Sequence, residues 1–223
     1  MPARDASSSF LDLFRGGNLR SLIGGLALLG ASFIAEHFAN AYALSYLLRP
    51  TSHYVGDLLL DNLPVVNLNI IIVEGALIAI VVGALYLTIY RPRYILFAIK
   101  ALALLIATRA IFISLTHVGI YPGAVAPEAT GLFDSIYRYF HFQTGLFFSG
   151  HTSTPFLAAL IFWDRMPERT VFLALSVIFG ASVLLAHVHY SIDVFAAPFM
   201  AYGVFSIARH LFPRDYALTR ASA

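Results

Sequence analysis

Two short motifs decide how this chain is organised. Residues 147–152 read FFSGHT, residues 186–194 read AHVHYSIDV, and long apolar runs adjoin both of them. Each motif therefore places histidine at the edge of a very hydrophobic region, and the second motif adds a carboxylate. The rest of the chain has to supply a hydrophobic scaffold that brings two imidazoles and this carboxylate together.

The composition is that of a membrane protein. Of the 223 residues, 59% are hydrophobic and 12% are charged, whereas a soluble domain has roughly 25% charged residues. Because the chain has no cysteine, it can form no disulfide, thiolate metal site or cysteine nucleophile. The formal net charge of +2 comes from scattered arginines rather than a basic block, which gives nucleic-acid binding little support.

Six apolar runs are candidate transmembrane helices, because a helix needs ~20 mostly apolar residues to cross a bilayer. The predicted fold is an all-α bundle of six transmembrane helices over residues 19–212. The fourth run is short and reaches a usable length only if it begins upstream, near Gln143. The six runs are Leu19–Leu48, Leu68–Tyr90, Tyr94–Thr116, His151–Trp163, Thr170–Ala186 and Ile192–Phe212.

The distribution of arginine predicts the orientation, because cytoplasmic connections carry an excess of Lys and Arg. One side carries most of the arginines, and the other carries only Arg49 and Arg138 among acidic residues. Both termini are predicted to be cytoplasmic, residues 1–18 as a flexible polar start and 213–223 as a short tail. The histidine motifs then lie at or near the non-cytoplasmic side. The cytoplasmic set is Arg4, Arg15, Arg20, Arg91, Arg93, Arg165, Arg169, Arg209, Arg214 and Arg220.

Several ionisable residues lie inside the predicted helices, where charge is costly and indicates function. Lys100 can extend its ammonium to the cytoplasmic surface, and Glu36 and His37 are expected to pair with a neighbouring helix. Arg109 lies nearer the non-cytoplasmic side, and a buried guanidinium needs an anionic partner. Glu74 is one candidate, which would make the pair structural. A substrate phosphate is the other, because the planar guanidinium suits phosphate oxygens.

The histidine motifs predict a reactive site. His189 and Asp193 are four residues apart, so on a helix they share a face, and the carboxylate can bind one ring nitrogen while the other points away. His151 follows Ser149 and Gly150, where backbone N–H groups at a helix start can approach an anion. Together these residues supply a nucleophile or base, an acid and a phosphate-binding turn.

Two other interpretations of these histidines stay open. His151 and His189 could be interfacial residues at helix ends, joined by a hydrogen bond, although the site candidates all fall on one predicted side. A metal site built on His187, His189 and Asp193 is a further option. Its ligand pattern is incomplete, and His187 is two residues from His189 and therefore points to a different helix face.

With these residues in hand, the chain resembles the sphingomyelin synthases, which belong to the broader type 2 phosphatidic acid phosphatase superfamily. The residues 149–152 and 189–193 are similar to the third and fourth signature motifs of that family. Weaker similarity to the second motif covers Thr108-Arg109-Ala110-Ile111, Thr116 and Pro122-Gly123, and similarity to the first runs from Asp57 through Asp61 to Glu74-Gly75. The resemblance covers Pro50 to His210.

The chain also departs from the family at four places. The synthases carry glycine and aspartate where Thr144-Gly145 stands here, and often an acidic residue where Val188 stands. The phosphatases carry an arginine where Val183 stands, and the interval from Lys100 to Arg109 does not have their lysine–arginine spacing. The phosphatase branch is therefore the poorer match.

The resemblance implies a membrane lipid phosphotransferase that needs no metal or other cofactor. By this resemblance His189 would form a phosphohistidine, Asp193 would orient it, and His151 would protonate the leaving lipid alkoxide and then deprotonate the acceptor. The implied partners are a phospholipid donor and a lipid alcohol such as ceramide or diacylglycerol, within the bilayer. Phosphate would be bound by Arg109, Ser149 and Gly150, with Glu74, Tyr190 and Thr152 in supporting positions.

Two further functions are consistent with the same residues. A lipid phosphatase or phospholipase C-type hydrolase would pass the phosphohistidine to water. A non-catalytic lipid-binding or transport protein belongs to another class and would use Glu36, Glu74 and Arg109 along a pathway. Transporters of this size more often show internal repeats, and this sequence shows none.

Overall fold

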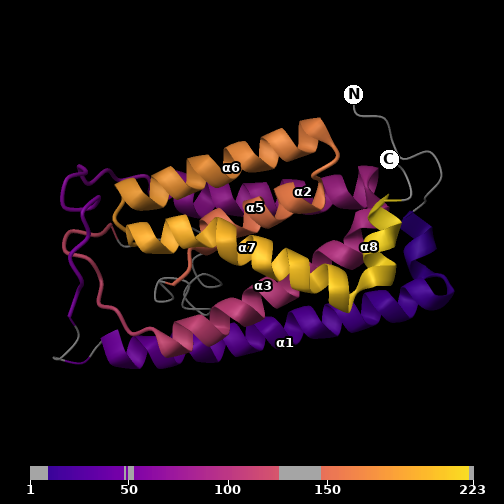
Figure 1. Ribbon diagram of the computed structural model, residues 1–223, viewed down its shortest axis with the longest axis horizontal. Helices are drawn as coiled ribbons and strands as arrows, with labels where there is room; N and C mark the ends of the chain where they lie inside the picture. Colours follow the sequence, from indigo (N-terminus) through magenta and orange to yellow (C-terminus); the bar gives the residue numbers. More distant parts are fainter. Residues whose placement is uncertain (1–9, 48, 50–52, 126–146, 221–223) are drawn as a thin grey trace.

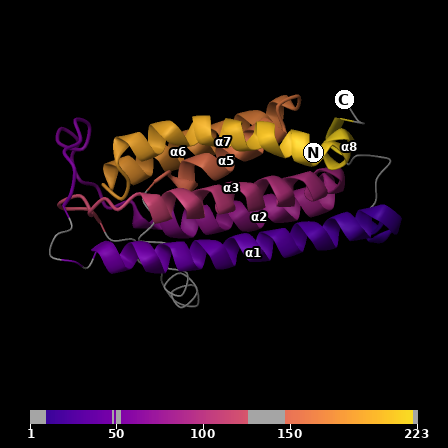
Figure 2. The same cartoon turned by 60° about the horizontal axis from the view of Figure 1, so that its bottom comes forward.

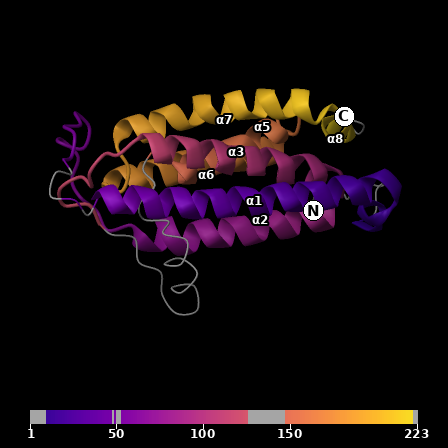
Figure 3. The same cartoon turned by 90° about the horizontal axis from the view of Figure 1, so that it is seen from below.

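The computed structural model is helical and contains no strand in the residues that it describes, 10–47, 49, 53–125 and 147–220. Within these described ranges, five helices are long and apolar enough to cross a membrane, which suggests an integral membrane protein. They run side by side along one axis (Figure 1), and the same arrangement is visible in the turned views of Figures 2 and 3. The five are α1 Gly16–Leu47, η2 Ile71–Gly75 with α2 Ala76–Tyr90, η3 Pro92–Tyr94 with α3 Ile95–Leu115, α6 Met166–Leu185 and α7 Ser191–Leu211.

The bounds of these five helices lie close to the bounds of the predicted apolar runs. The reason is that a long apolar segment in a membrane has to form its backbone hydrogen bonds internally, as a helix does. The largest difference is at α6, which begins at Met166 rather than Thr170. Pro167 lies in the first turn of α6, where the missing N–H of proline costs nothing. The polar residues before Thr170 thus belong to the helix.

The fourth predicted run forms α5, Gly150–Ile161, and its twelve residues are too few to cross a bilayer. They span about 18 Å, against a hydrocarbon core of ~30 Å. The expected extension towards Gln143 lies partly outside the described residues, but residues 147–149 are not helical. The Ser149 side chain accepts a hydrogen bond from the Thr152 N–H at 3.4 Å and so caps the helix at this point. The prediction of six spanning helices is therefore not confirmed.

The helices pack as two groups that meet through α3. Helix α1 lies along α3, α5 packs against α6 and α7, and α3 contacts α5 and α7. The main buried cluster lies where these elements meet and includes Phe97, Leu105, Phe148, Leu157 and Phe205. None of the residues of α2, all of which are described, is buried. The tightly packed part of the bundle therefore excludes α2 and contains the starts of α5 and α7.

The two ends of the bundle differ, and we call them the loop end and the α8 end. The loop end carries the segments 53–67, 116–125 and 186–190, on the left in Figure 1. The α8 end carries η1 Phe10–Phe14 and α8 Pro213–Arg220, on the right in Figure 1.

Helix α8 occupies most of the segment predicted as a short tail, and it is packed against the bundle. The buried carboxylate of Asp215 lies 2.5 Å from Lys100 Nζ and accepts a hydrogen bond from Ser21 Oγ at 2.8 Å. Lys100, which was expected to extend towards this side, thus ends on α8. Part of the N-terminal segment that was predicted to be flexible is also helical. Phe10–Phe14 form η1, and α1 begins at Gly16 rather than Leu19.

Candidate active site

The structure brings the two histidine motifs together at the starts of α5 and α7. The backbone N–H of Ser149 donates to the carbonyl of Asp193 at 3.0 Å, which joins the two chain segments directly. The imidazole rings of His151 and His189 have centroids 6.2 Å apart and an interplanar angle of 66°. Two residues that are distant in sequence therefore share one place in the fold.

His189 and Asp193 are in contact, but not because they share a helix face as predicted. His189 precedes α7, which begins at Ser191, and Asp193 lies in the first turn of α7. Asp193 Oδ2 accepts a hydrogen bond from the Tyr190 N–H at 3.0 Å, so the carboxylate also caps the helix. This capping turn, rather than helical periodicity, places Asp193 Oδ2 3.4 Å from His189 Nδ1.

The His189–Asp193 contact is buried and not yet a hydrogen bond. The side chains of both residues are almost fully buried, and Nδ1 of His189 makes no hydrogen bond among the described residues. Catalytic hydrogen bonds are often long in ligand-free sites and shorten when substrate binds. Because the carboxylate faces Nδ1, Nε2 is the ring nitrogen that remains for chemistry.

A backbone carbonyl holds the imidazole of His151 through its Nε2 atom. Its Nε2 lies 3.0 Å from the carbonyl oxygen of Ile72 in η2, and since a carbonyl can only accept, Nε2 carries the proton and Nδ1 holds the free lone pair. In an α-helix the N–H of Ala76 would bond to Ile72. Here it bonds to Val73 instead, three residues back, where the π-helical turn η2 passes into α2. No side-chain pattern in the sequence signals this contact.

Arg109 packs onto the same turn from α3. Its Nε donates to the carbonyl of Phe148 at 3.1 Å, and a Cβ atom added to Gly150 would lie 2.4 Å from Nη1. Glycine is therefore required at position 150 for the guanidinium to approach the backbone this closely. Arg109 is six residues before the end of α3 at Leu115, about 9 Å inside the helix end.

Glu36 of α1 pairs with this arginine. Its Oε1 lies 3.4 Å from Arg109 Nη1, and its side chain is 7% exposed. The sequence predicted a partner on a neighbouring helix for Glu36, and it named Glu74 as a candidate carboxylate for Arg109, but it did not connect Glu36 with Arg109. The reason is that 73 positions of chain separate the two residues, and only the packing of α1 on α3 brings them together.

The other predicted phosphate ligand, Ser149, is fully buried, with its side chain turned into α5. Its Oγ accepts from the N–H of Thr152 and lies 3.2 Å from the Thr152 hydroxyl. Ser176 of α6 donates in turn to the carbonyl of Thr152 at 2.8 Å. Ser149 and Thr152 thus set the start of α5 and its contact with α6, and phosphate binding by Ser149 remains a prediction.

The predicted supporting residues Glu74 and Tyr190 each belong to a segment that contacts or contains one of the histidines. Glu74 belongs to the η2 turn, two residues after Ile72. Tyr190 follows His189 directly, and its hydroxyl donates to the carbonyl of Gly119 at 2.7 Å and accepts from the N–H of Val55 at 3.2 Å. Tyr190 therefore ties the loops 53–67 and 116–125 to the start of α7.

A buried carboxylate, Asp57, completes this attachment of the loop end. Its Oδ2 accepts from the N–H of Ser191 at 2.7 Å, and its Oδ1 accepts from the N–H groups of Leu59 and Leu60 at 3.0 and 3.2 Å. Burial raises the pKa of the Asp57 carboxyl, but the hydrogen bonds from Ser191, Leu60 and Leu59 outweigh it and bring the pKa below its ordinary value of 3.8. Asp57 thus acts as an N-cap for α7 supplied by a distant loop.

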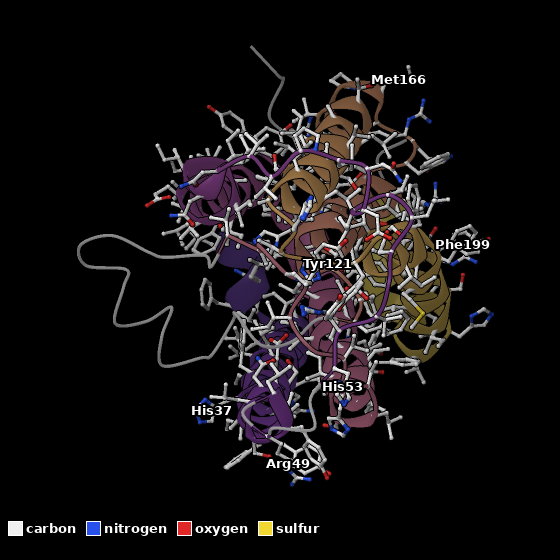
Figure 4. The ribbon with its side chains drawn as sticks, turned by 90° about the vertical axis from the view of Figure 1, so that its left-hand side faces the viewer. His37, Arg49, His53, Tyr121, Met166 and Phe199 are labelled. Atoms are coloured by element: carbon white, nitrogen blue, oxygen red, sulfur yellow. The ribbon has the colours of Figure 1, made fainter. Side chains whose placement is uncertain are left out.

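Tyr121 covers the middle of the loop end, as the end-on view of Figure 4 shows. Its hydroxyl donates to Asp61, and this hydrogen bond raises the pKa of Tyr121 to about 12. Its ring packs edge-on against His187, 5.3 Å between centroids. His187 is buried, and neither of its ring nitrogens makes a hydrogen bond among the described residues. No group of three or more His, Asp or Glu side chains within the described ranges is placed to hold a metal ion.

Comparison with known proteins gives one family match, and it covers this site. Residues 144–211 match the family model described as PAP2 superfamily C-terminal, and the matched segment contains both histidine motifs. No curated protein matches the chain. Members of this superfamily are phosphatase-type enzymes, so the match suggests a lipid phosphatase or phosphotransferase type of function. The matched segment thus supports membership of the type 2 phosphatidic acid phosphatase superfamily.

Proposed function

We propose that the chain is a lipid head-group phosphotransferase of the sphingomyelin synthase type. It moves a phosphocholine or phosphoethanolamine group from a glycerophospholipid to a lipid alcohol, ceramide or diacylglycerol. The observation that carries this proposal is the meeting of His151, the His189–Asp193 pair and Arg109 around the Ser149–Gly150 turn. Each group has a different chemical task in phosphoryl transfer.

In the first half-reaction, His189 Nε2 attacks the phosphorus of the donor lipid. A P–N bond forms and the P–O bond to diacylglycerol breaks. Asp193, 3.4 Å from Nδ1, stabilises the positive charge that develops on the ring. His151, which takes up a proton at Nδ1 from water as the phosphate binds, gives that proton to the departing alkoxide, while Nε2 stays bonded to the Ile72 carbonyl. With ring centroids 6.2 Å apart, one phosphate group can contact both imidazoles.

In the second half-reaction, the same groups act in reverse. The neutral Nδ1 of His151 takes the proton from the hydroxyl of the acceptor lipid, whose oxygen attacks the phosphohistidine. The new P–O bond forms as the P–N bond to His189 breaks. Arg109 and the backbone N–H groups at the start of α5 stabilise the charge on the phosphate oxygens in both steps.

The test is head-group transfer by the purified protein in liposomes that contain labelled phosphatidylcholine or phosphatidylethanolamine with ceramide or diacylglycerol. We expect labelled product lipid and an acid-labile label on the protein. His189→Ala should lower the rate by at least about 10³-fold, because it removes the nucleophile. The matched control is His210→Ala, which changes an exposed histidine near the end of α7 and should leave the rate unchanged.

Two outcomes would count against this proposal. If free head-group phosphate were the sole product, the site would be that of a hydrolase, in which water takes the phosphate group from His189. A His189→Ala variant that retains the wild-type rate would exclude the phosphohistidine route.

A further inference from the structure

Glu36 is a buried carboxylate beside the proposed phosphate site that the mechanism above does not use. It lies on the face of α1 that packs against α3, where Ser32, Ala39, Asn40 and Ala43 are also buried. Its Oε1 is 3.4 Å from Nη1 of Arg109. A carboxylate placed against an anion-binding arginine competes with the anion, so its presence there requires a reason.

The charge balance of the site points to that reason. The other lysine and arginine side chains in the described part of the chain lie in α8, beside η1, or in the helix turns nearest the α8 end, except Arg49, whose guanidinium lies 3.8 Å over the Tyr46 ring. Arg109 is therefore the cation at the Ser149–Gly150 turn, and Glu36 and Asp193 are carboxylates beside it and beside His189. Apart from the histidines and Glu74 of η2, these three groups sum to one negative charge before substrate arrives.

We propose that Glu36 is a specificity-determining residue, which makes the site accept monoanionic phosphodiesters and disfavour dianionic phosphomonoesters. The inference rests on the proposed function, since it concerns the same phosphate site. A diester head group brings one negative charge to the site, whereas a phosphomonoester brings up to two. In a buried site the second charge meets the Glu36 carboxylate at close range with little screening by water. The repulsion from Glu36 is therefore larger for the monoester than for the diester.

Glu36 also positions the guanidinium. The carboxylate holds Nη1 while the Phe148 carbonyl holds Nε, so the fork is fixed from two sides against Gly150. Removing the charge but keeping the shape separates the two roles. In Glu36→Gln the amide oxygen can still accept from Nη1, and only the electrostatic selection against the dianion is lost.

The experiment measures anion binding, so that it does not depend on turnover. Dissociation constants for dimethyl phosphate, a monoanionic diester, and for inorganic phosphate are determined by phosphorus NMR titration at mildly alkaline pH, in detergent. Wild-type protein should bind the diester at least as tightly as the dianion. Glu36→Gln should shift the ratio of the two constants towards inorganic phosphate by at least about tenfold. Glu36→Asp keeps the charge and should keep a ratio near that of the wild type.

The matched control is Ser32→Ala. Ser32 is buried on the same face of α1, one turn away, and its hydroxyl donates to the Leu29 carbonyl within its own helix, so the ratio should not change. An unchanged ratio in folded Glu36→Gln would overturn the inference. If that variant does not fold, tighter binding of inorganic phosphate than of dimethyl phosphate by the wild type would overturn it as well.

Activity then separates this inference from the proposed function. The relative kcat/KM for phosphatidic acid over phosphatidylcholine should rise in Glu36→Gln. Head-group transfer by the wild type with an unchanged binding ratio in the variant refutes the role of Glu36 and leaves the proposed function standing. A shifted binding ratio with no turnover of either lipid refutes the proposed function and leaves the role of Glu36 at an anion site standing.

Discussion

Gly150 carries the sharpest steric requirement of the site. A Cβ atom at this position would lie 2.4 Å from Arg109 Nη1 and 3.1 Å from its Cζ. The obstructing atoms are the far end of a flexible side chain, so the guanidinium can move away without disturbing the backbone. The steric cost therefore falls on the position of Arg109, the proposed phosphate-binding group, and not on folding.

We predict that Gly150→Ala lowers kcat/KM by about 10- to 100-fold, because a displacement of a binding group by ~1 Å has an effect of this size. The temperature of unfolding should change little. The control is Gly203→Ala on α7, where an added Cβ would meet no atom within 4 Å, and this variant should retain full activity. Both quantities are measured on detergent-purified protein. A fully active Gly150→Ala variant would show that Arg109 functions without a glycine at position 150.

At the scale of elements, the start of α7 depends on a carboxylate from a distant loop. Asp57 accepts from the Ser191 N–H at 2.7 Å, which satisfies one of the N–H groups that have no partner within the helix. Asp57 therefore stabilises both its own loop and the helix that follows His189. Because its pKa is lowered in the folded state, this stabilisation depends on pH.

The sign follows from linkage. A carboxyl with a lowered pKa adds stability above its ordinary value of 3.8, and this stability is lost as the pH falls through the folded-state pKa. We predict that Asp57→Asn destabilises the protein at neutral pH by about 1 kcal/mol, the usual contribution of an N-cap. The variant should also lose less stability than the wild type between neutral pH and pH values below about 4.

Thermal unfolding over this pH range measures both effects. The control is Asp61→Asn. The Asp61 carboxylate lies in the same loop but bonds Tyr121 instead of the start of α7, so this variant should keep the wild-type dependence of stability on pH. Parallel pH profiles for Asp57→Asn and the wild type would mean that the Asp57 carboxylate does not supply the pH-dependent cap.

At the scale of the whole molecule, α5 lies on the path by which the chain returns from one end of the bundle to the other. Helix α3 ends at the loop end and α6 begins at the α8 end (Figure 1), and α5, which has too few residues for a membrane span, leads into α6. As a result η1 and α8 lie at the same end. That end also carries most of the arginines, which is why we propose that it is cytoplasmic and that the site faces the other side.

Because the chain has no cysteine, single-cysteine variants test this orientation directly. Val65 at the loop end and Met166 at the start of α6 are both exposed. With a membrane-impermeant maleimide on intact cells, Val65→Cys should be labelled and Met166→Cys should be labelled only after permeabilisation. The reverse pattern would place the site on the cytoplasmic side.

The sequence by itself determined most of the long helices and selected the residues of the candidate site. Helices α1, α3, α6 and α7 follow from the length of apolar runs, because backbone hydrogen bonding inside a helix is a local property. His151, His189, Asp193 and Arg109 could be selected because ionisable side chains beside such runs are costly and need a reason. The capping signal at Ser149 was also present in the sequence, and it would have placed the start of α5 at Gly150.

Only the tertiary structure decided the contacts that define the site. The partner of Arg109 depends on how α1 packs against α3, and the partner of His151 is the Ile72 carbonyl, a backbone group that every residue possesses. His189 meets Asp193 through a capping turn, although the four-residue spacing predicted a shared helix face. Contacts between distant segments, and contacts to the backbone, arise from packing geometry and leave no pattern in the order of side chains.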